Sequence, residues 1–439
     1  MTKLAKELTL YGLLMVAIGS CIGSGIFVTP SEIARLLPSS ILILLVWTLG
    51  GIITLTGALT FAELGSLFPF AGGIYVFLRE AYGGWLGFLY GWAYLLIITS
   101  GSIAVLALAF SYYLSVFIPM DVTWKIATSI IAIIILTTLN ILRAKFGEIF
   151  SNIFTGLKIA GSLIIIGVGF LYGNSELSFK NLPSCSLSAS GLSSFGVALT
   201  GVLFSYGGWQ HATFLAGETG NPSRNVPVAM ITGALVVTLI YLLANTGYML
   251  LLPVETIVTS SKVAAEAVSS VLPFGGILVA GIIAISTFGT MGIYTLSAPR
   301  IYYAMAADGL FFKGIAKVHP EFKTPVNAIL VQSAWAIVLL LFWGTFENLI
   351  TYTVSIEWIF FTFAAAGIFI FRKKLKHRER SYKTFGYPVT PVIFILINIW
   401  FIINITIRKP LHMGIGIIFL LLGVPVYLFF KRKNKVLNK

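Results

Sequence analysis

Long apolar runs fill most of the chain, and short polar links separate them. Each run holds about 20 apolar residues without strict alternation of apolar and polar positions, which predicts membrane-spanning helices rather than barrel strands. The runs predict twelve spans, at 11–36, 39–67, 84–118, 123–142, 151–172, 191–218, 226–252, 273–305, 325–343, 349–371, 389–407 and 412–430.

The composition supports this interpretation, because 58% of the 439 residues are hydrophobic and 10% are charged. A soluble fold of this size cannot bury so much apolar surface, so we expect an all-α integral membrane protein. The N-terminal "MTKLAKELTLYG" is not followed by the small-residue cleavage site of a signal peptide. The longest link, residues 173–190, is too short for a soluble domain, so residues 1–439 are expected to form a single transmembrane domain.

Basic residues are distributed unevenly between the two sides of this topology. An even number of spans puts both termini on one side, and that side also holds the basic link 372–383 and the basic tail 431–439. The positive-inside rule therefore places both termini in the cytoplasm of a multi-pass cell membrane protein, in a plasma or inner membrane. The net charge of +14 then reflects topology and contact with anionic membrane lipids, and nucleic acid is not an expected partner.

Two spans contain glycine-rich stretches near their midpoints, "GSCIGSGIF" (Gly19–Phe27) and "FSYGGWQ" (Phe204–Gln210). Glycine costs about 1 kcal/mol relative to alanine in a helix interior, and close helix packing is the alternative explanation for either stretch alone. The stretches occupy matching positions in two five-span blocks of opposite orientation, 11–172 and 191–371, to which 389–430 adds helices 11 and 12. Matched interruptions in an inverted repeat indicate the binding site of a secondary transporter.

Unwinding at these stretches exposes backbone groups that can bind a charged ligand. The N–H groups between Ile22 and Ile26, at the start of a short half-helix, suit a carboxylate, and the carbonyl groups at the broken ends suit a cation. An α-amino acid zwitterion meets both requirements. The second stretch offers Phe204, Tyr206 and Trp209 but no acidic residue, which favours a neutral substrate side chain.

Five motifs, in order along the chain, resemble a known family: "IGSGIFVTP", "AGGIYVFLREAYG" (71–83), "FSYGGWQ", "GETGNPSRNVPVAM" and "PRIYYAMAADGLFF" (299–312). They are similar to the amino acid–polyamine–organocation (APC) superfamily, and most to bacterial-type members of its L-amino acid transporter (LAT) branch. The resemblance implies a LeuT-like fold with a 5+5 inverted repeat, unwound helices 1 and 6, and alternating access. It assigns the substrate carboxylate to Ile22, Gly23, Ser24, Gly25 and Ile26, and the amino group to Phe204, Ser205 and Gly207.

Lys158 stands inside the fifth span, where a charged side chain costs roughly 2.5–3.5 kcal/mol on insertion scales. Snorkelling towards the membrane surface is one explanation for it. The alternative, which the resemblance supports, is that its ammonium bonds to the unwound first span, links it to span 8 near Ser286, and replaces the sodium ion of coupled relatives. The hypothesis that Lys158 instead carries a coupled proton is left open. Tyr241, in the middle of span 7, is expected to bond to the same site.

These observations predict sodium-independent transport of neutral L-amino acids, with the protein acting as an exchanger. The alternatives are a proton-coupled symporter, a polyamine or cationic amino acid antiporter, a non-transporting amino acid sensor and a channel. No enzyme activity, cofactor or metal is expected, because there is no Walker A pattern and Cys21 and Cys185 have no metal-binding spacing. The link "SVFIPMDVTWK" lacks the cysteine that joins animal relatives to a glycoprotein, so no disulfide-linked heavy chain is expected, and the oligomeric state is left open.

Overall fold

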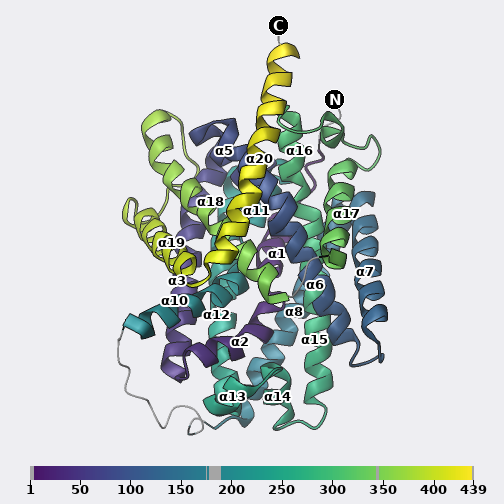
Figure 1. The fold of residues 1–439 in the computed structure, drawn as a ribbon, viewed down its shortest axis with the longest axis vertical. Helices are drawn as coiled ribbons and strands as arrows, with labels where there is room; N and C mark the ends of the chain where they lie inside the picture. Colours follow the sequence, from purple (N-terminus) through teal and green to yellow (C-terminus); the bar gives the residue numbers. More distant parts are fainter. Residues whose placement is uncertain (1–3, 175, 177–188, 343–345, 438–439) are drawn as a thin grey trace.

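The computed structural model describes residues 4–174, 176, 189–342 and 346–437. In this part of the chain the secondary structure is helical, apart from one isolated parallel bridge between Leu8 and Thr219. Figure 1 shows the helices packed into one elongated bundle, with both chain ends at the top. Placing both ends at one end of the bundle agrees with an even number of crossings.

The first half of the chain forms a broken helix followed by four long helical elements. Its helices are α1 Leu10–Cys21, α2 Gly25–Leu36, α3 Ser40–Leu67, α4 Ile74–Tyr82, α5 Gly84–Ala93, the π-helix η1 Tyr94–Ile98, α6 Thr99–Leu114, α7 Val122–Leu142 and α8 Ala144–Tyr172.

The second half begins with another broken helix. Its helices are α10 Ala189–Tyr206, α11 His211–Phe214, η2 Ala216–Glu218, α12 Pro222–Leu251, α13 Val254–Thr259, α14 Val263–Ser269, α15 Gly275–Ser297, α16 Pro299–Ala307, η3 Lys313–Ala316, α17 Val326–Phe342, α18 Phe346–Lys374, α19 Val389–Arg408 and α20 Pro410–Leu437.

Nine helices in the described part of the chain are long and apolar enough to cross a membrane. Two further apolar helices, Gly191–Tyr206 and Val326–Phe342, are shorter, and α18 occupies the expected span 349–371. Twelve crossings therefore stay a prediction. The expected continuous span 84–118 differs from the structure, because the π-helix η1 interrupts it and the helix ends at Leu114. Hydropathy reports apolar length and does not register such a local change of hydrogen-bond pattern.

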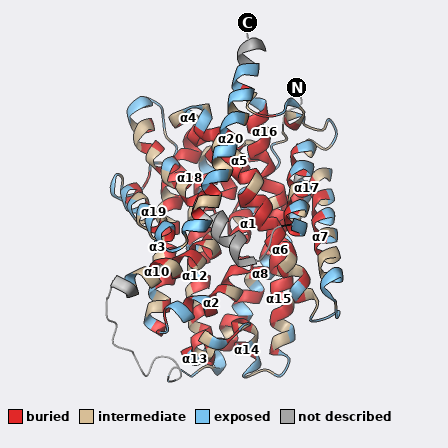
Figure 2. Ribbon diagram, viewed as in Figure 1, coloured by how far each residue is buried: buried red, intermediate tan, exposed pale blue. Residues whose placement is uncertain are grey.

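The broken helix α1–α2 lies at the centre of the bundle. Of its most apolar 18-residue stretch, 89% is buried, against 22% for the corresponding stretch within Met413–Lys433 of α20. Figure 2 shows this contrast as a largely red α1 and an extensively pale blue α20. A helix that is apolar on every side must be buried in protein or face lipid. We infer that α1–α2 is buried in protein and that α20 faces lipid.

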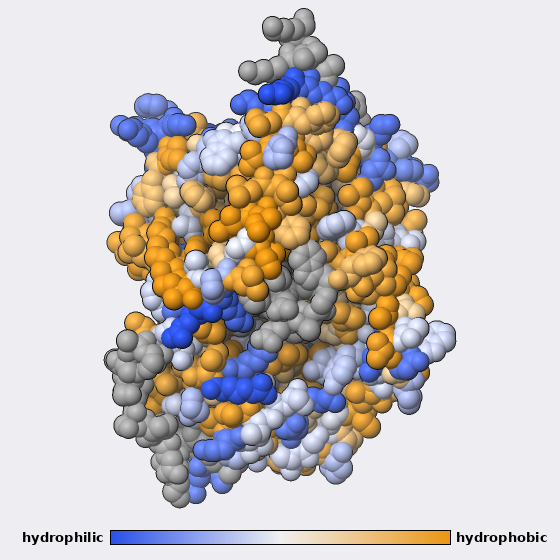
Figure 3. All heavy atoms as spheres, viewed as in Figure 1, coloured by the Kyte–Doolittle hydropathy of each residue, from blue (hydrophilic) through white to orange (hydrophobic). Residues whose placement is uncertain are grey.

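The surface agrees with a membrane environment. Figure 3 shows apolar side chains over much of the middle of the bundle, and hydrophilic ones at the top, near the end of α20 and the α18–α19 link, as well as in the lower part of the face. Those two segments contain the basic runs at 372–383 and 431–435. The positive charge thus collects at the end where the two termini lie.

Buried ion pairs hold this same end together. Arg300 on α16 donates two hydrogen bonds to Glu218, and both side chains are fully buried. Glu63 on α3 forms ion pairs with Arg372 at 2.6 Å and Arg380 at 3.1 Å. Removing one member of a buried pair leaves an uncompensated charge, so these contacts fix how the helices meet here.

The N-terminal segment is fastened to this end. The Leu8 N–H donates to the Glu218 carbonyl at 2.9 Å, and the Gly220 N–H donates to the Leu8 carbonyl at 3.1 Å. Thr9 caps the start of α1 and donates its hydroxyl to Glu148 on α8 at 2.6 Å. The start of α1 is therefore bound both to η2 and to α8.

Candidate functional site

The first interruption lies between α1 and α2. Residues Ile22, Gly23 and Ser24 link the two half-helices, and α2 begins at Gly25. Within the described residues, the backbone N–H groups of Ser24, Gly25 and Ile26 have no hydrogen-bond acceptor, and the buried Ser24 hydroxyl has no partner either. Free N–H groups at a helix N-terminus attract anions. The first break therefore presents donors suited to a carboxylate.

The second interruption follows α10, which ends at Tyr206. Gly207, Gly208 and Gln210 belong to the turn before α11, and Gly208 has a φ of +126°. A Cβ atom on Gly208 would lie 2.5 Å from the Ser20 carbonyl carbon, so no other residue fits. The Ser20 hydroxyl donates to the Gly208 carbonyl at 2.7 Å. The two interruptions are therefore in direct contact.

Lys158 on α8 binds the broken end of α1. Its fully buried ammonium donates to the Gly19 carbonyl and to the Thr290 hydroxyl, each at 2.6 Å. The Ser286 hydroxyl lies 3.0 Å from both carbonyl oxygens of Ile22–Gly23. Lys158 thus contacts α15 at Thr290, one helical turn from Ser286, and the sequence does not fix the rotation that decides between these two residues.

Tyr241 on α12 joins the two interruptions. Its hydroxyl lies 2.7 Å from the Cys21 carbonyl oxygen and 2.8 Å from the Ser205 carbonyl oxygen. A hydroxyl has one proton to donate, so it serves one of these two acceptors at a time. The side chain is fully buried, and it thereby ties the end of α1 to the end of α10.

Two small cavities meet at Phe204. The Gly23 cavity is lined by the first break, with Ser24, Gly25 and Ser205, and the Glu357 cavity is lined by Tyr94, Thr99, Gln210, His211 and Glu357. Both have Phe204 in their walls, together with Ser102, Gly207 and Tyr294. Each measures about 20 Å³, room for about one or two water molecules. The structure is thus a nearly closed state of the site.

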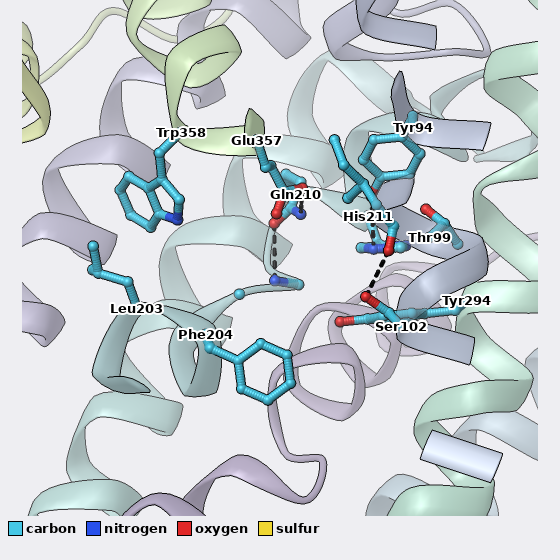
Figure 4. Close-up of a pocket in the computed structure, with 13 residues that line it drawn as sticks. Tyr94, Thr99, Ser102, Leu203, Phe204, Gln210, His211, Tyr294, Glu357 and Trp358 are labelled. Carbon is cyan, nitrogen blue, oxygen red and sulfur yellow. Dashed lines mark hydrogen bonds between the residues drawn. The ribbon is translucent and has the colours of Figure 1, made fainter. Parts of the chain in front are cut away.

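The arrangement around Phe204 is visible in Figure 4. Glu357 and Gln210 lie above the Phe204 ring, while Tyr94 and His211 lie to the right. Phe204 is on the wall that the two cavities share. Its ring is therefore placed to separate the donors of the first break from the polar groups of the Glu357 cavity.

Glu357 is the residue that the sequence reasoning missed. The second stretch itself has no acidic residue, but this buried side chain on α18 lines the Glu357 cavity, which shares Phe204 with the Gly23 cavity. Its signal was present in "SIEWIFFTF", where one acidic residue interrupts an apolar run. An ionisable residue inside a membrane span indicates a functional site.

The buried His211 has hydrogen-bonding partners on both ring nitrogens. His211 has its Nε2 atom 3.1 Å from the Tyr94 hydroxyl and its Nδ1 atom 2.5 Å from the Ser297 hydroxyl. Cys21 is a buried free thiol, and Cys185 lies outside the described residues. Both ring nitrogens of the histidine are therefore engaged by neighbouring hydroxyl groups.

Fold and site together define a class: a membrane protein of apolar helices in which two interrupted helices line small cavities inside the bundle. The amino acid permease family model matches residues 8–430. The chain belongs to this family, within the APC superfamily, as the five sequence motifs implied.

Its relatives are named as transporters. The chain is 33% identical to the serine/threonine exchanger SteT of Bacillus subtilis (strain 168) over 98% of both chains. It is 30% identical to the human b(0,+)-type amino acid transporter 1 over 98% of this chain and 88% of the relative. It is 28% identical to the human cystine/glutamate transporter, again over 98% of this chain and 86% of the relative. Amino acid transport is therefore the family activity.

Proposed function

We propose that the protein exchanges neutral L-amino acids across the cell membrane without sodium, by alternating access. The observation that supports this most is the set of free N–H groups at Ser24, Gly25 and Ile26, of which Ser24 and Gly25 line the Gly23 cavity. A substrate carboxylate would accept from them, as anions do at helix N-termini.

The second break would hold the amino group of the substrate. In this proposal Ile22, Gly23, Ser24, Gly25 and Ile26 hold the carboxylate, and Phe204, Ser205 and Gly207 frame the ammonium. An ammonium suits carbonyl oxygens, and the last carbonyls of a helix lack partners within their own helix. Phe204 would close the site on the side of the Glu357 cavity.

Sodium independence is proposed from the position of Lys158. Its ammonium lies against the Gly19 carbonyl, where a fixed positive charge can take the place of a bound cation. Tyr241 and Ser286 would transmit movement, because each bonds to backbone of the first break. Exchange also agrees with a relative that is named an exchanger.

The architecture we propose is LeuT-like and forms one transmembrane domain of twelve helices. Repeats 11–172 and 191–371 would be related by inversion, with 389–430 added, and both termini would lie in the cytoplasm, where the basic residues gather. No disulfide-linked heavy chain is proposed, because the link between α6 and α7, residues 115–121, has no cysteine.

We propose a small substrate side chain. One relative, 33% identical over 98% of both chains, is named a serine/threonine exchanger. Glu357 supports a second candidate, a cationic amino acid antiporter, because a carboxylate next to the Gly23 cavity can bind a positive side chain.

The test is counterflow in proteoliposomes with the purified full chain. Radiolabelled amino acids covering neutral, cationic and acidic side chains are offered outside, with unlabelled amino acid inside, in sodium and in choline buffer. We expect saturable exchange of small neutral amino acids at equal rates in both buffers. Uptake that requires sodium would refute sodium independence, preference for lysine or arginine would favour the second candidate, and binding without flux would indicate a sensor.

A further inference from the structure

Glu357 is a buried acid with an incomplete set of partners. Its side chain is 7% exposed, and its Oε1 atom accepts a hydrogen bond from the Gln210 Nε2 atom at 2.9 Å. Its Oε2 atom makes no hydrogen bond to any described residue, and no described lysine or arginine pairs with it. An ionised carboxylate buried without a positive partner is strongly disfavoured. Glu357 therefore needs a proton or a cation at Oε2.

The orientation of Gln210 identifies which oxygen is available. The Gly208 backbone N–H donates to the Gln210 Oε1 atom at 3.0 Å. A backbone N–H can only donate, so Oε1 must be the amide oxygen and the Gln210 nitrogen must point to Glu357. Glu357 Oε1 is thus an obligatory acceptor, and a proton on this carboxyl group belongs on Oε2.

The neighbouring titratable groups offer no positive charge. Tyr94 from η1 and Tyr294 from α15 line the Glu357 cavity, and Tyr90 from α5 is close enough to interact electrostatically with the acid. His211 from α11 is fixed between two hydroxyl groups. Lys158 is bound at the far side of the first break, to Gly19 and Thr290. These neighbours leave the buried charge uncompensated.

We propose that Glu357 binds a proton on one side of the membrane and releases it on the other, so that a proton accompanies the incoming amino acid in the exchange proposed above. The proposal rests on the amino acid transport proposed above. The step forms one O–H bond at Oε2 with a proton from the side of uptake, and breaks it again with release of that proton on the other side. No other bond changes.

A hydrogen-bonded chain connects this acid to both interruptions. It runs from Glu357 through Gln210 to the Gly208 N–H, and from the Gly208 carbonyl to the Ser20 hydroxyl on α1. A carboxylate accepts a stronger hydrogen bond than a neutral carboxylic acid. Proton uptake thus weakens the anchor between α18 and the second break, and proton release strengthens it.

The test compares uptake with and without an imposed pH gradient in proteoliposomes whose membrane potential is clamped. The probe is the neutral amino acid that exchanges fastest in the screen above, and luminal pH is followed with a trapped fluorescent dye. An acidic exterior is expected to raise wild-type uptake, by up to about tenfold for a gradient of about one pH unit, and substrate addition is expected to acidify the lumen.

Glu357→Gln keeps the shape of a neutral carboxylic acid and cannot titrate. We expect the ratio of uptake with and without the gradient to fall to about one, while Glu357→Asp keeps part of the wild-type ratio. His211→Gln is the matched control, because it removes the other titratable non-tyrosine group of the same cavity, and it should keep the wild-type ratio.

Three results would overturn the proposal. The first is wild-type uptake that is equal with and without the pH gradient, with no luminal acidification. The second is a Glu357→Gln variant whose ratio of uptake with and without the gradient equals that of the wild type. The third is inhibition of uptake by lysine that disappears in Glu357→Gln, which would assign the acid to a cationic ligand. The wild-type result decides even if a variant fails to fold. Absence of exchange at equal pH in wild-type proteoliposomes would instead refute amino acid transport itself.

Discussion

Replacing Lys158 by methionine tests the link between α8 and the broken end of α1. Methionine keeps most of the apolar stem and removes the ammonium, which donates at 2.6 Å to Gly19 and to Thr290. The substitution removes both of these charge-assisted hydrogen bonds, but the Gly19 carbonyl keeps the Thr290 hydroxyl as a donor at 3.0 Å, so the net loss is about that of one such bond. Such a bond contributes about 1.5–3 kcal/mol.

Converted at about 1.4 kcal/mol per factor of ten, this loss predicts exchange that is roughly 10- to 100-fold slower. The assay is counterflow of the preferred amino acid, normalised to the amount of protein inserted. Lys145→Met is the matched control, because it makes the same change at an exposed position of the same helix, and it should exchange at the wild-type rate.

The reasoning would be refuted if Lys158→Met exchanged at the wild-type rate and eluted as a folded protein in detergent. The ammonium would then be a tolerated buried charge, and the position of the first break would not depend on it. Slow exchange together with loss of folded protein would assign Lys158 to stability, which thermal melting of the detergent-solubilised variant separates from a transport defect.

Three further substitutions probe other parts of the structure. Gly23→Ala should weaken substrate binding by about 5- to 100-fold without unfolding, because the new methyl group meets nothing closer than 3.6 Å but enters the cavity; equal affinity in a binding assay would show that this glycine only serves the backbone. Tyr241→Phe removes the hydroxyl group that serves the Cys21 and Ser205 carbonyl groups, and it should slow exchange roughly tenfold. An unchanged rate of counterflow would contradict this. Arg300→Met should cost about 3–5 kcal/mol by isolating the Glu218 charge, seen as a lower melting temperature that Glu218→Gln in the same chain partly restores.

The two interruptions were predictable because their cause is local. Glycine and serine in the middle of an apolar run are unfavourable in a helix whatever surrounds them, and the links Ile22–Ser24 and Gly207–Gln210 fall inside the two quoted stretches.

Contacts between helices were less predictable, because they depend on rotation and depth. Thr290 and Ser286 lie one turn apart on α15, and they reach carbonyl groups of α1 and of the link after it, respectively, so the sequence could not say which one meets Lys158. Glu357 was missed for a related reason. Its partner Gln210 lies 147 positions away, and only the packing of α18 against the second break brings the two together.

The shared proton of Tyr241 has a consequence for how the substrate is recognised. One hydroxyl group serves two carbonyl acceptors, and the Cys21 carbonyl also accepts from the Gly23 N–H at 2.8 Å. The Ser205 carbonyl thus depends on a donor that it must share. The ammonium group of a bound substrate has three N–H donors, so it would donate to one of the two carbonyl oxygens while the Tyr241 hydroxyl donates to the other. The substrate and Tyr241 would then each bond to one of the two carbonyl groups, and the two broken helices would be held rigidly relative to each other only when both bonds are formed.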